Sequence, residues 1–113
     1  MNGKEIQELL QQFQSYQQQL QTILLQKDNL KMQQLEIDAA LDELEKAEGE
    51  GYKIVGPIMV KKPVDELKSE LKDKRASIDL RIKTLEKTEN RLTQKLQDIQ
   101  TKLQKLLRTK PPE

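Results

Sequence analysis

Hydrophobic residues recur at alternating intervals of three and four through the first part of the chain, the spacing of a helix with one apolar face. With Ile6 at position a of a seven-residue repeat, ten of the twelve a and d positions are apolar over six repeats. No Pro or Gly lies between Lys4 and Glu48, so the pattern predicts one long helix over residues 4–48. Its a and d residues are Ile6, Leu9, Phe13, Tyr16, Leu20, Ile23, Lys27, Leu30, Gln34, Ile37, Leu41 and Leu44.

A second run of the same period follows Pro63, and nine of its twelve a and d positions are apolar. We expect a helix over residues 63–109, because Pro suits a first helical turn and the pair Pro111-Pro112 cannot continue a helix. Its a and d residues are Lys68, Leu71, Arg75, Ile78, Ile82, Leu85, Glu89, Leu92, Leu96, Ile99, Leu103 and Leu106.

Between the two runs, residues 52–60 are rich in β-branched and aromatic side chains and carry Gly56-Pro57 at their centre. This composition predicts a β-hairpin, and its apolar content disfavours the alternative of a structureless loop. A two-stranded hairpin is marginal by itself in water, and its open edges recruit other strands. We therefore expect this hairpin to join equivalent hairpins of other subunits in a shared sheet or barrel.

The two runs match each other when the chain is folded about the hairpin. The numbers of facing residues then add to 112, as for Ile6 with Leu106 and for Leu30 with Ile82, and every a position faces a d position. The expected fold is mainly α: a long antiparallel two-helix coiled coil joined by one hairpin, in a single domain over residues 1–113. Lys27 and Glu89 fall in adjacent layers of the seam, and we expect them to form an ion pair that fixes the register.

Charge supports this pairing and separates the two halves of the 113-residue chain. Its 20 basic and 19 acidic side chains nearly cancel, but residues 1–48 carry a net −5 and residues 61–113 a net +6. Reading the basic half as a nucleic-acid surface is disfavoured, because its basic residues alternate with acids and no aromatic lies among them.

Composition excludes several classes of protein. The absence of Cys and His removes thiolate chemistry, the usual general base and the commonest metal ligand, and no glycine-rich phosphate loop is present. We expect no enzyme, no cofactor and no metal site. No apolar run approaches the roughly 20 residues that span a bilayer, and the start of the chain has no signal-peptide core. These features predict a cytoplasmic protein that does not enter a membrane.

Several apolar residues fall outside the a and d positions, and two of them, Leu10 and Leu107, lie where the expected coiled coil ends. One interpretation is a tip that binds apolar segments of other proteins, opened by fraying of the last turns. The other is that these leucines widen the helix seam at e positions, and periodicity alone leaves both open. The set is Leu10, Leu24, Leu25, Met32, Leu35, Leu67, Leu80 and Leu107.

The order helix, hairpin, helix resembles the β-type subunits of archaeal prefoldin over nearly the whole chain. The most specific segments are residues 52–60 (YKIVGPIMV), 80–86 (LRIKTLE) and 89–92 (ENRL), with Gln12-Phe13 and Gln26-Lys27 in addition. The single hairpin is similar to the β type, because the α type carries two hairpins. The Thr88-Glu89-Asn90 step departs from the Gln-Glu that the family often has before Arg-Leu.

The resemblance implies a hexamer of two α and four β subunits, whose hairpins build a double β-barrel platform that carries six coiled-coil arms. It also implies that the arm tips hold unfolded proteins without ATP and deliver them to a group II chaperonin. A passive coiled-coil spacer or adaptor is the alternative function. The implied client-binding residues are Ile6, Leu9, Leu10, Phe13, Leu103, Leu106 and Leu107. The implied assembly residues are Tyr52, Ile54, Val55, Ile58, Met59 and Val60. The implied chaperonin contacts are Lys102, Lys105, Arg108 and Lys110.

Overall fold

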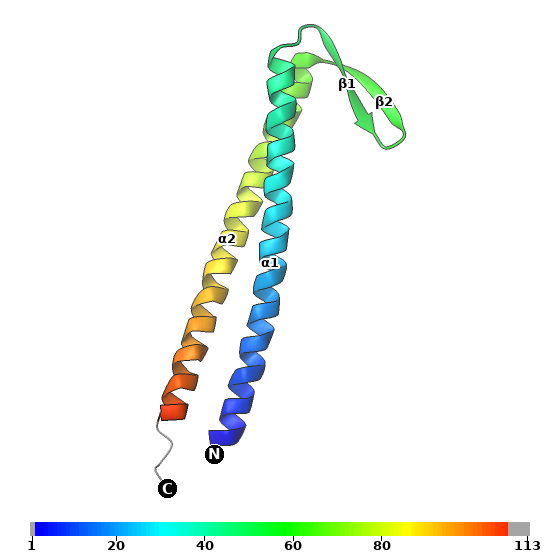
Figure 1. The fold of residues 1–113 in the computed structure, drawn as a ribbon. Helices are drawn as coiled ribbons and strands as arrows, with labels where there is room; N and C mark the ends of the chain where they lie inside the picture. The colour runs from blue at the N-terminus through cyan, green and yellow to red at the C-terminus, as the bar shows by residue number, and fades with distance from the viewer. Residues whose placement is uncertain (1, 109–113) are drawn as a thin grey trace. The chain divides into compact units, whose positions relative to one another are not determined.

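The structure of the protein is a computed structural model that describes residues 2–108. The elements follow the order α1 (Asn2–Glu45), β1 (Glu50–Val55), β2 (Ile58–Pro63) and α2 (Val64–Arg108) (Figure 1). The expected fold class, two long helices joined by one antiparallel hairpin, is confirmed.

The first helix ends at Glu45, three residues before the expected end at Glu48. Its last turn closes with a short-range bond, in which the Lys46 N–H donates to the Glu43 carbonyl oxygen at 3.2 Å. Gly49 then has a φ of +82°, in the left-handed region that glycine adopts without steric cost. The turn towards the hairpin therefore begins earlier than the composition of residues 46–48 indicates.

Both strands are longer than the expected hairpin of residues 52–60, since β1 begins at Glu50 and β2 continues to Pro63. Pro63 is the last residue of the strand and not part of the first helical turn. The N–H of Val64 donates to the Gly49 carbonyl oxygen at 2.9 Å, which ties the start of α2 to the end of the preceding loop. At the other end of α2, the expected terminus at Thr109 lies outside the described residues.

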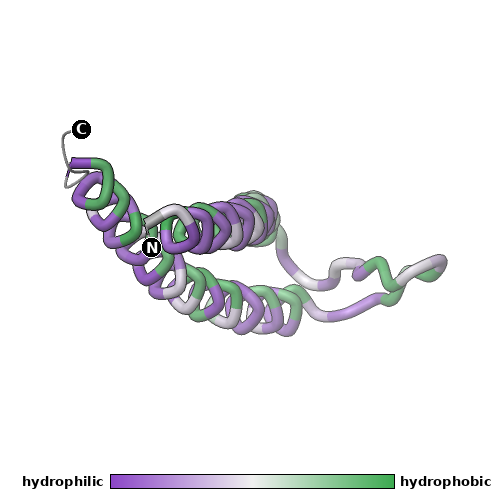
Figure 2. The backbone as a smooth tube through the Cα atoms, turned by 90° about the horizontal axis from the view of Figure 1, so that it is seen from below, coloured by the Kyte–Doolittle hydropathy of each residue, from purple (hydrophilic) through white to green (hydrophobic). Residues whose placement is uncertain are grey.

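The chain divides into two compact units, and each contains a stretch of both helices. The terminal unit comprises the described parts of residues 1–27 and 84–113, and the hairpin unit comprises residues 28–83. In both units hydrophobic positions alternate with hydrophilic ones along each helix (Figure 2). All twelve predicted a and d residues of α1 are buried or partly buried, as are all twelve of α2, so the predicted seam is confirmed.

In the terminal unit, α1 and α2 lie antiparallel side by side (Figure 1). Leu92, which is only 2% exposed, is the most completely buried side chain of the described chain. The expected ion pair is present: Lys27 Nζ donates to Glu89 Oε1 at 2.5 Å, with both side chains partly buried. Lys95 Nζ lies 5.5 Å from the centre of the Tyr16 ring, a cation–π contact between the two helices.

The hairpin unit contains most of the remaining buried core. Arg75 occupies an a position but reaches across to Asp38, with 2.6 Å from Nε to Oδ1 and 3.2 Å from Nη2 to Oδ2. This bidentate hydrogen bond lowers the pKa of Asp38, because the guanidinium stabilises the charged carboxylate. The apolar residues of the core are Leu30, Ile37, Val64, Leu67, Ile78 and Ile82.

Candidate functional site

The hairpin is one place where the structure leaves apolar side chains uncovered. Its strands pair in the register Val55 with Ile58 and Ile54 with Met59, around a two-residue turn. Gly56 has a φ of +57° and Pro57 holds a negative φ, the combination found in a type II′ turn. The turn residues therefore fix the register of the hairpin.

The tip of the hairpin is apolar on both of its faces. Residues directly opposite in an antiparallel pair lie on the same face, so Ile54 and Met59 share one face while Val55 and Ile58 share the other. These four side chains are between 48% and 74% exposed. The described chain therefore leaves both faces open to a partner.

The base of the hairpin is fixed to α2 by one carboxylate. Lys62 Nζ donates to Glu70 Oε1 at 2.6 Å, and Lys53 Nζ donates to Glu70 Oε2 at 3.1 Å. Both hydrogen bonds lower the pKa of Glu70, and the bond from Lys62 has the larger effect. The bond between Lys62 and Glu70 also raises the pKa of Lys62. One lysine comes from each strand, so a single side chain of α2 holds both.

Gly51 brings β1 close to the same helix. A Cβ atom at this position would lie 2.8 Å from Leu67 Cδ1, so a larger residue would force the leucine to move. Leu67 itself is only 7% exposed. It is one of the apolar residues outside the a and d positions, and the hairpin covers it.

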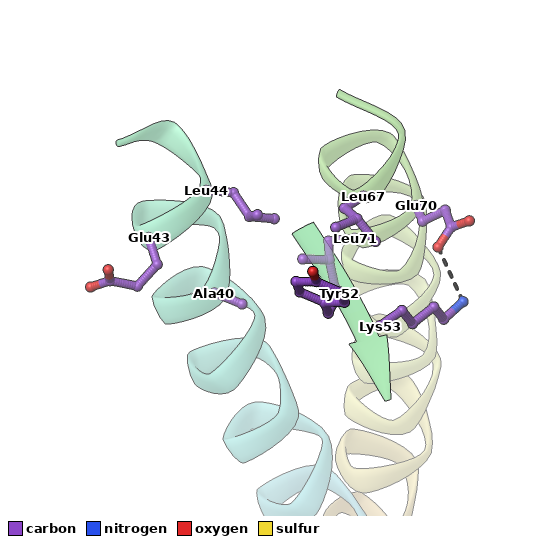
Figure 3. Close-up of a pocket in the computed structure, with 8 residues that line it drawn as sticks. All are labelled: Ala40, Glu43, Leu44, Tyr52, Lys53, Leu67, Glu70 and Leu71. Atoms are coloured by element: carbon purple, nitrogen blue, oxygen red, sulfur yellow. Dashed lines mark hydrogen bonds and ion pairs between the residues drawn. The ribbon is translucent and has the colours of Figure 1, made fainter. Parts of the chain in front are cut away.

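Beyond this close approach, a groove of about 310 Å³ lies between β1 and the helices of the hairpin unit. Figure 3 shows Tyr52 and Lys53 on opposite sides of the strand, with Lys53 directed towards Glu70. Tyr52 lines the groove, although 63% of its surface is exposed. The groove is lined by Ala40, Glu43, Leu44, Tyr52, Lys53, Leu67, Glu70 and Leu71.

The six expected assembly residues differ in exposure: five side chains are exposed and one is partly covered. Val60 is the partly covered residue, opposite Lys53 on the face whose lysines reach Glu70. The other five, Tyr52, Ile54, Val55, Ile58 and Met59, are exposed.

The seven expected client-binding residues lie in the terminal unit. Five of them occupy seam positions: Leu9 is buried, and Ile6, Phe13, Leu103 and Leu106 are partly buried. Only two point away from the seam, Leu10 at 53% exposure and Leu107 at 65%. Of the seven expected residues, these two leucines are therefore the exposed ones.

The basic residues expected at the end of α2 are placed only in part. Lys102, Lys105 and Arg108 are exposed, and Lys110 lies outside the described residues. Within the part of the chain that the structure describes, no cluster of three or more acidic side chains is arranged to hold a metal ion. In that same part, neither helix is long and apolar enough to cross a bilayer.

Comparison with known proteins identifies the family. The prefoldin subunit family matches residues 7–110 of the chain. The chain belongs to the prefoldin subunit family. Among its relatives, the prefoldin subunit beta of Thermococcus kodakarensis is 37% identical over 110 residues, which cover 96% of this chain and 92% of that protein. The prefoldin subunit beta of Archaeoglobus fulgidus is 37% identical over 105 residues, covering 91% and 90% of the two chains.

The fold agrees with a solved member of the prefoldin family. The crystal structure of the prefoldin beta subunit from Thermococcus strain KS-1 matches with a TM-score of 0.86 and 37% sequence identity. The match covers 96% of this chain and 95% of that one. The resemblance to β-type prefoldin subunits is thereby confirmed, and a role in a prefoldin chaperone follows from membership of the family.

The contacts that orient the hairpin in this prefoldin-family chain were not predicted from the sequence. Glu70, Lys53 and Lys62 carry no periodic signal, because each is a charged residue among many others. The detectable signal was Leu67, an apolar residue one turn into α2 and outside the seam, together with Gly51 early in the strand segment. An apolar residue in that position needs a cover, and the nearby strand supplies it.

Proposed function

We propose that the chain is a subunit of an ATP-independent holdase, which binds unfolded proteins at the tip of the terminal unit, around Leu10 and Leu107, and prevents their aggregation. The observation that carries the proposal is the exposure of Leu10 and Leu107 at the ends of the paired helices of a prefoldin-family chain. Burying apolar surface of a client there contributes about 25 cal/mol per Å², a weak interaction at each tip. Several tips acting together provide avidity, and weak contacts permit release. No step requires a catalytic group or a nucleotide.

The proposed assembly uses the hairpin. Its exposed faces and unpaired edges suit pairing with other hairpins, which would cover Ile54, Val55, Ile58 and Met59. The partner is a prefoldin α subunit, in a hexamer of two α and four β subunits. Held clients pass to a group II chaperonin, with Lys102, Lys105 and Arg108 as contacts for an acidic surface.

The double variant Leu10→Ser/Leu107→Ser tests the tip. We expect the variant complex to assemble normally but to lose most of its suppression of aggregation, because the two exposed apolar side chains are gone. Light scattering of a diluted, chemically denatured protein measures the effect in the absence of nucleotide.

The control for this test is Leu25→Ser, a leucine that is 67% exposed and lies outside the tip. It should protect the client as the unmodified complex does. Full protection by the tip variant would overturn the proposal. A wild-type complex that does not slow aggregation at all would favour the passive spacer or adaptor.

A further inference from the structure

The first helix has apolar residues on two opposite faces. Its a and d residues point into the seam, whereas Met32 and Ala39 occupy position f and Leu35 position b, on the far side of the helix. The intervals of three and four between them place all three on one face. Met32 is 60% exposed and Leu35 is 69% exposed, so neither the second helix nor the hairpin covers them.

Acidic side chains surround these apolar residues. Asp28, Glu36 and Asp42 are all exposed at positions b and c. Asp28 and Glu36 lie one turn before and one turn after Met32, and Asp42 lies one turn after Ala39. None of the three forms an ion pair within residues 2–108. Lys31 is the single basic residue of this stretch and lies at position e, on the flank of the seam. We call the set Met32, Leu35, Ala39, Asp28, Glu36 and Asp42 the outer patch.

The shape and size of the outer patch restrict its occupant. A convex helix face cannot enclose a small molecule. Three apolar side chains also offer far less than the roughly 800 Å² per partner of a stable specific complex. A second copy of the chain is a poor match, because the outward face of α2 in the hairpin unit presents one large exposed apolar residue, Leu80, and its nearby Lys83 already pairs with Asp79 at 3.2 Å. A weakly held, extended or helical segment fits these limits.

We propose that the outer patch is a second binding surface for clients, selective for non-native segments that combine apolar with basic side chains. The inference rests on the proposed holdase function and adds a preference of charge to it. The apolar residues bury the client's apolar side chains, and the three unpaired carboxylates attract its Lys and Arg residues. The terminal unit has the opposite bias, because Lys105 and Arg108 lie in the last turn of α2 beside Leu107.

Two fluorescently labelled peptides distinguish binding at the outer patch from binding at the terminal unit. The Leu/Lys peptide has leucines at helical spacing with lysines between them, and the Leu/Glu peptide has glutamates in place of the lysines. Fluorescence anisotropy measures binding of each peptide to the full chain. The outer patch should bind the Leu/Lys peptide more tightly than the Leu/Glu peptide. The variant Met32→Gln/Leu35→Gln should weaken this binding about tenfold, the size of effect that two exposed anchors provide. The variant Asp28→Asn/Glu36→Gln should weaken it severalfold and reduce its dependence on salt.

Leu80→Gln is the matched control, because Leu80 is 65% exposed on the outward face of the other helix. Its binding of the Leu/Lys peptide should be unchanged. The proposal is wrong if the Met32→Gln/Leu35→Gln variant binds the Leu/Lys peptide as tightly as the wild type does, or if Leu80→Gln weakens this binding equally. It is also wrong if the Met32→Gln/Leu35→Gln variant weakens binding of the Leu/Lys and Leu/Glu peptides to the same extent. It is also wrong if sedimentation shows that the outer-patch variant disrupts a dimer of the chain, since the patch would then bind a second copy.

The tip variant Leu10→Ser/Leu107→Ser keeps the two proposals distinguishable. It should lose suppression of aggregation and binding of the Leu/Glu peptide, yet bind the Leu/Lys peptide as before. Failure of the outer patch therefore leaves the tip result intact, and failure of the tip leaves the peptide preference of the outer patch intact.

Discussion

At the scale of single residues, the charged pair in the seam of the terminal unit has two opposing effects. Lys27 and Glu89 are 12% and 26% exposed, so both lose much of their hydration when the helices pair. Their mutual hydrogen bond offsets that loss only in part, as is common for partly buried ion pairs. The pair is therefore expected to specify register more than to add stability.

Replacing both charges with Lys27→Leu/Glu89→Leu should raise the melting temperature, because two apolar side chains fill the seam without a desolvation cost. The expected gain is about 1 kcal/mol in the free energy of unfolding. Thermal unfolding followed by circular dichroism measures it. The single variant Lys27→Leu is the control and should melt below the wild type, since Glu89 then stays partly buried without this partner. A double variant that melts at or below the wild-type temperature would contradict the interpretation.

At the scale of elements, the orientation of the hairpin depends on one acidic residue of α2. Glu70 accepts hydrogen bonds from a lysine of each strand, and these bonds lower its pKa. A carboxylate with a lowered folded-state pKa stabilises the structure above its ordinary pKa, and the contribution is lost as pH falls through the folded value. The attachment of the hairpin to α2 is therefore sensitive to acid.

We expect the hairpin to loosen from α2 as the pH falls below the ordinary value of 4.5 for a glutamate, while the helices remain paired. Amide hydrogen exchange across β1 and β2 measures the loosening, compared with exchange around the buried Leu92. Glu70→Gln should show the loosened hairpin already at neutral pH and should lose this pH dependence. Equal protection of the hairpin in Glu70→Gln and wild type would show that Gly51 and Leu67 suffice to hold it.

The elements differ in how much the sequence could predict about them. The two helices and their seam followed from the period of the apolar residues, which is a local property, and even the Lys27–Glu89 pair followed from the matched registers of the two runs. The bounds were less accurate near Glu48 and Pro63, because the positive φ of Gly49 and the strand pairing of Pro63 decide them. The burial of Leu67 could not be predicted, because its cover comes from a separate strand, which the heptad pattern does not describe.

The exposure of the candidate binding residues was predictable only in part. Position in the heptad already distinguishes Leu10 and Leu107 from their neighbours on the seam. It does not indicate that Val60 is partly covered while Ile54 and Met59 are open, since this depends on which face of the hairpin turns towards Glu70. Contacts between elements thus supplied the part that periodicity could not.

At the scale of the whole molecule, the residues that pair the helices differ from those that the proposed assembly through the hairpin would use. The seam residues are buried or partly buried within the two units, whereas the apolar side chains of the hairpin tip are exposed in the described chain. A change at the hairpin tip should therefore affect association with other subunits and leave the helices folded.

The double variant Ile54→Ser/Met59→Ser should retain the helical circular dichroism of the wild type but fail to form the complex with a prefoldin α subunit. Removing two apolar side chains from one hairpin face takes away most of the surface that a neighbouring subunit would bury there. Native mass spectrometry after co-expression measures the complex. Leu35→Ser, an equally exposed change on α1, should assemble normally, and normal assembly of the hairpin variant would exclude that face as an interface.

The ion pair between Lys27 and Glu89 also bears on which helices pair when copies of the chain are close together. Suppose that the same helix from two chains formed a parallel pair in register. Lys27 would then face Lys27 in a pair of α1 helices, and Glu89 would face Glu89 in a pair of α2 helices. Like charges in a partly buried seam repel, so parallel pairing of identical helices is disfavoured. Even where copies of the chain are crowded together, α1 would thus favour an antiparallel α2 over a second α1.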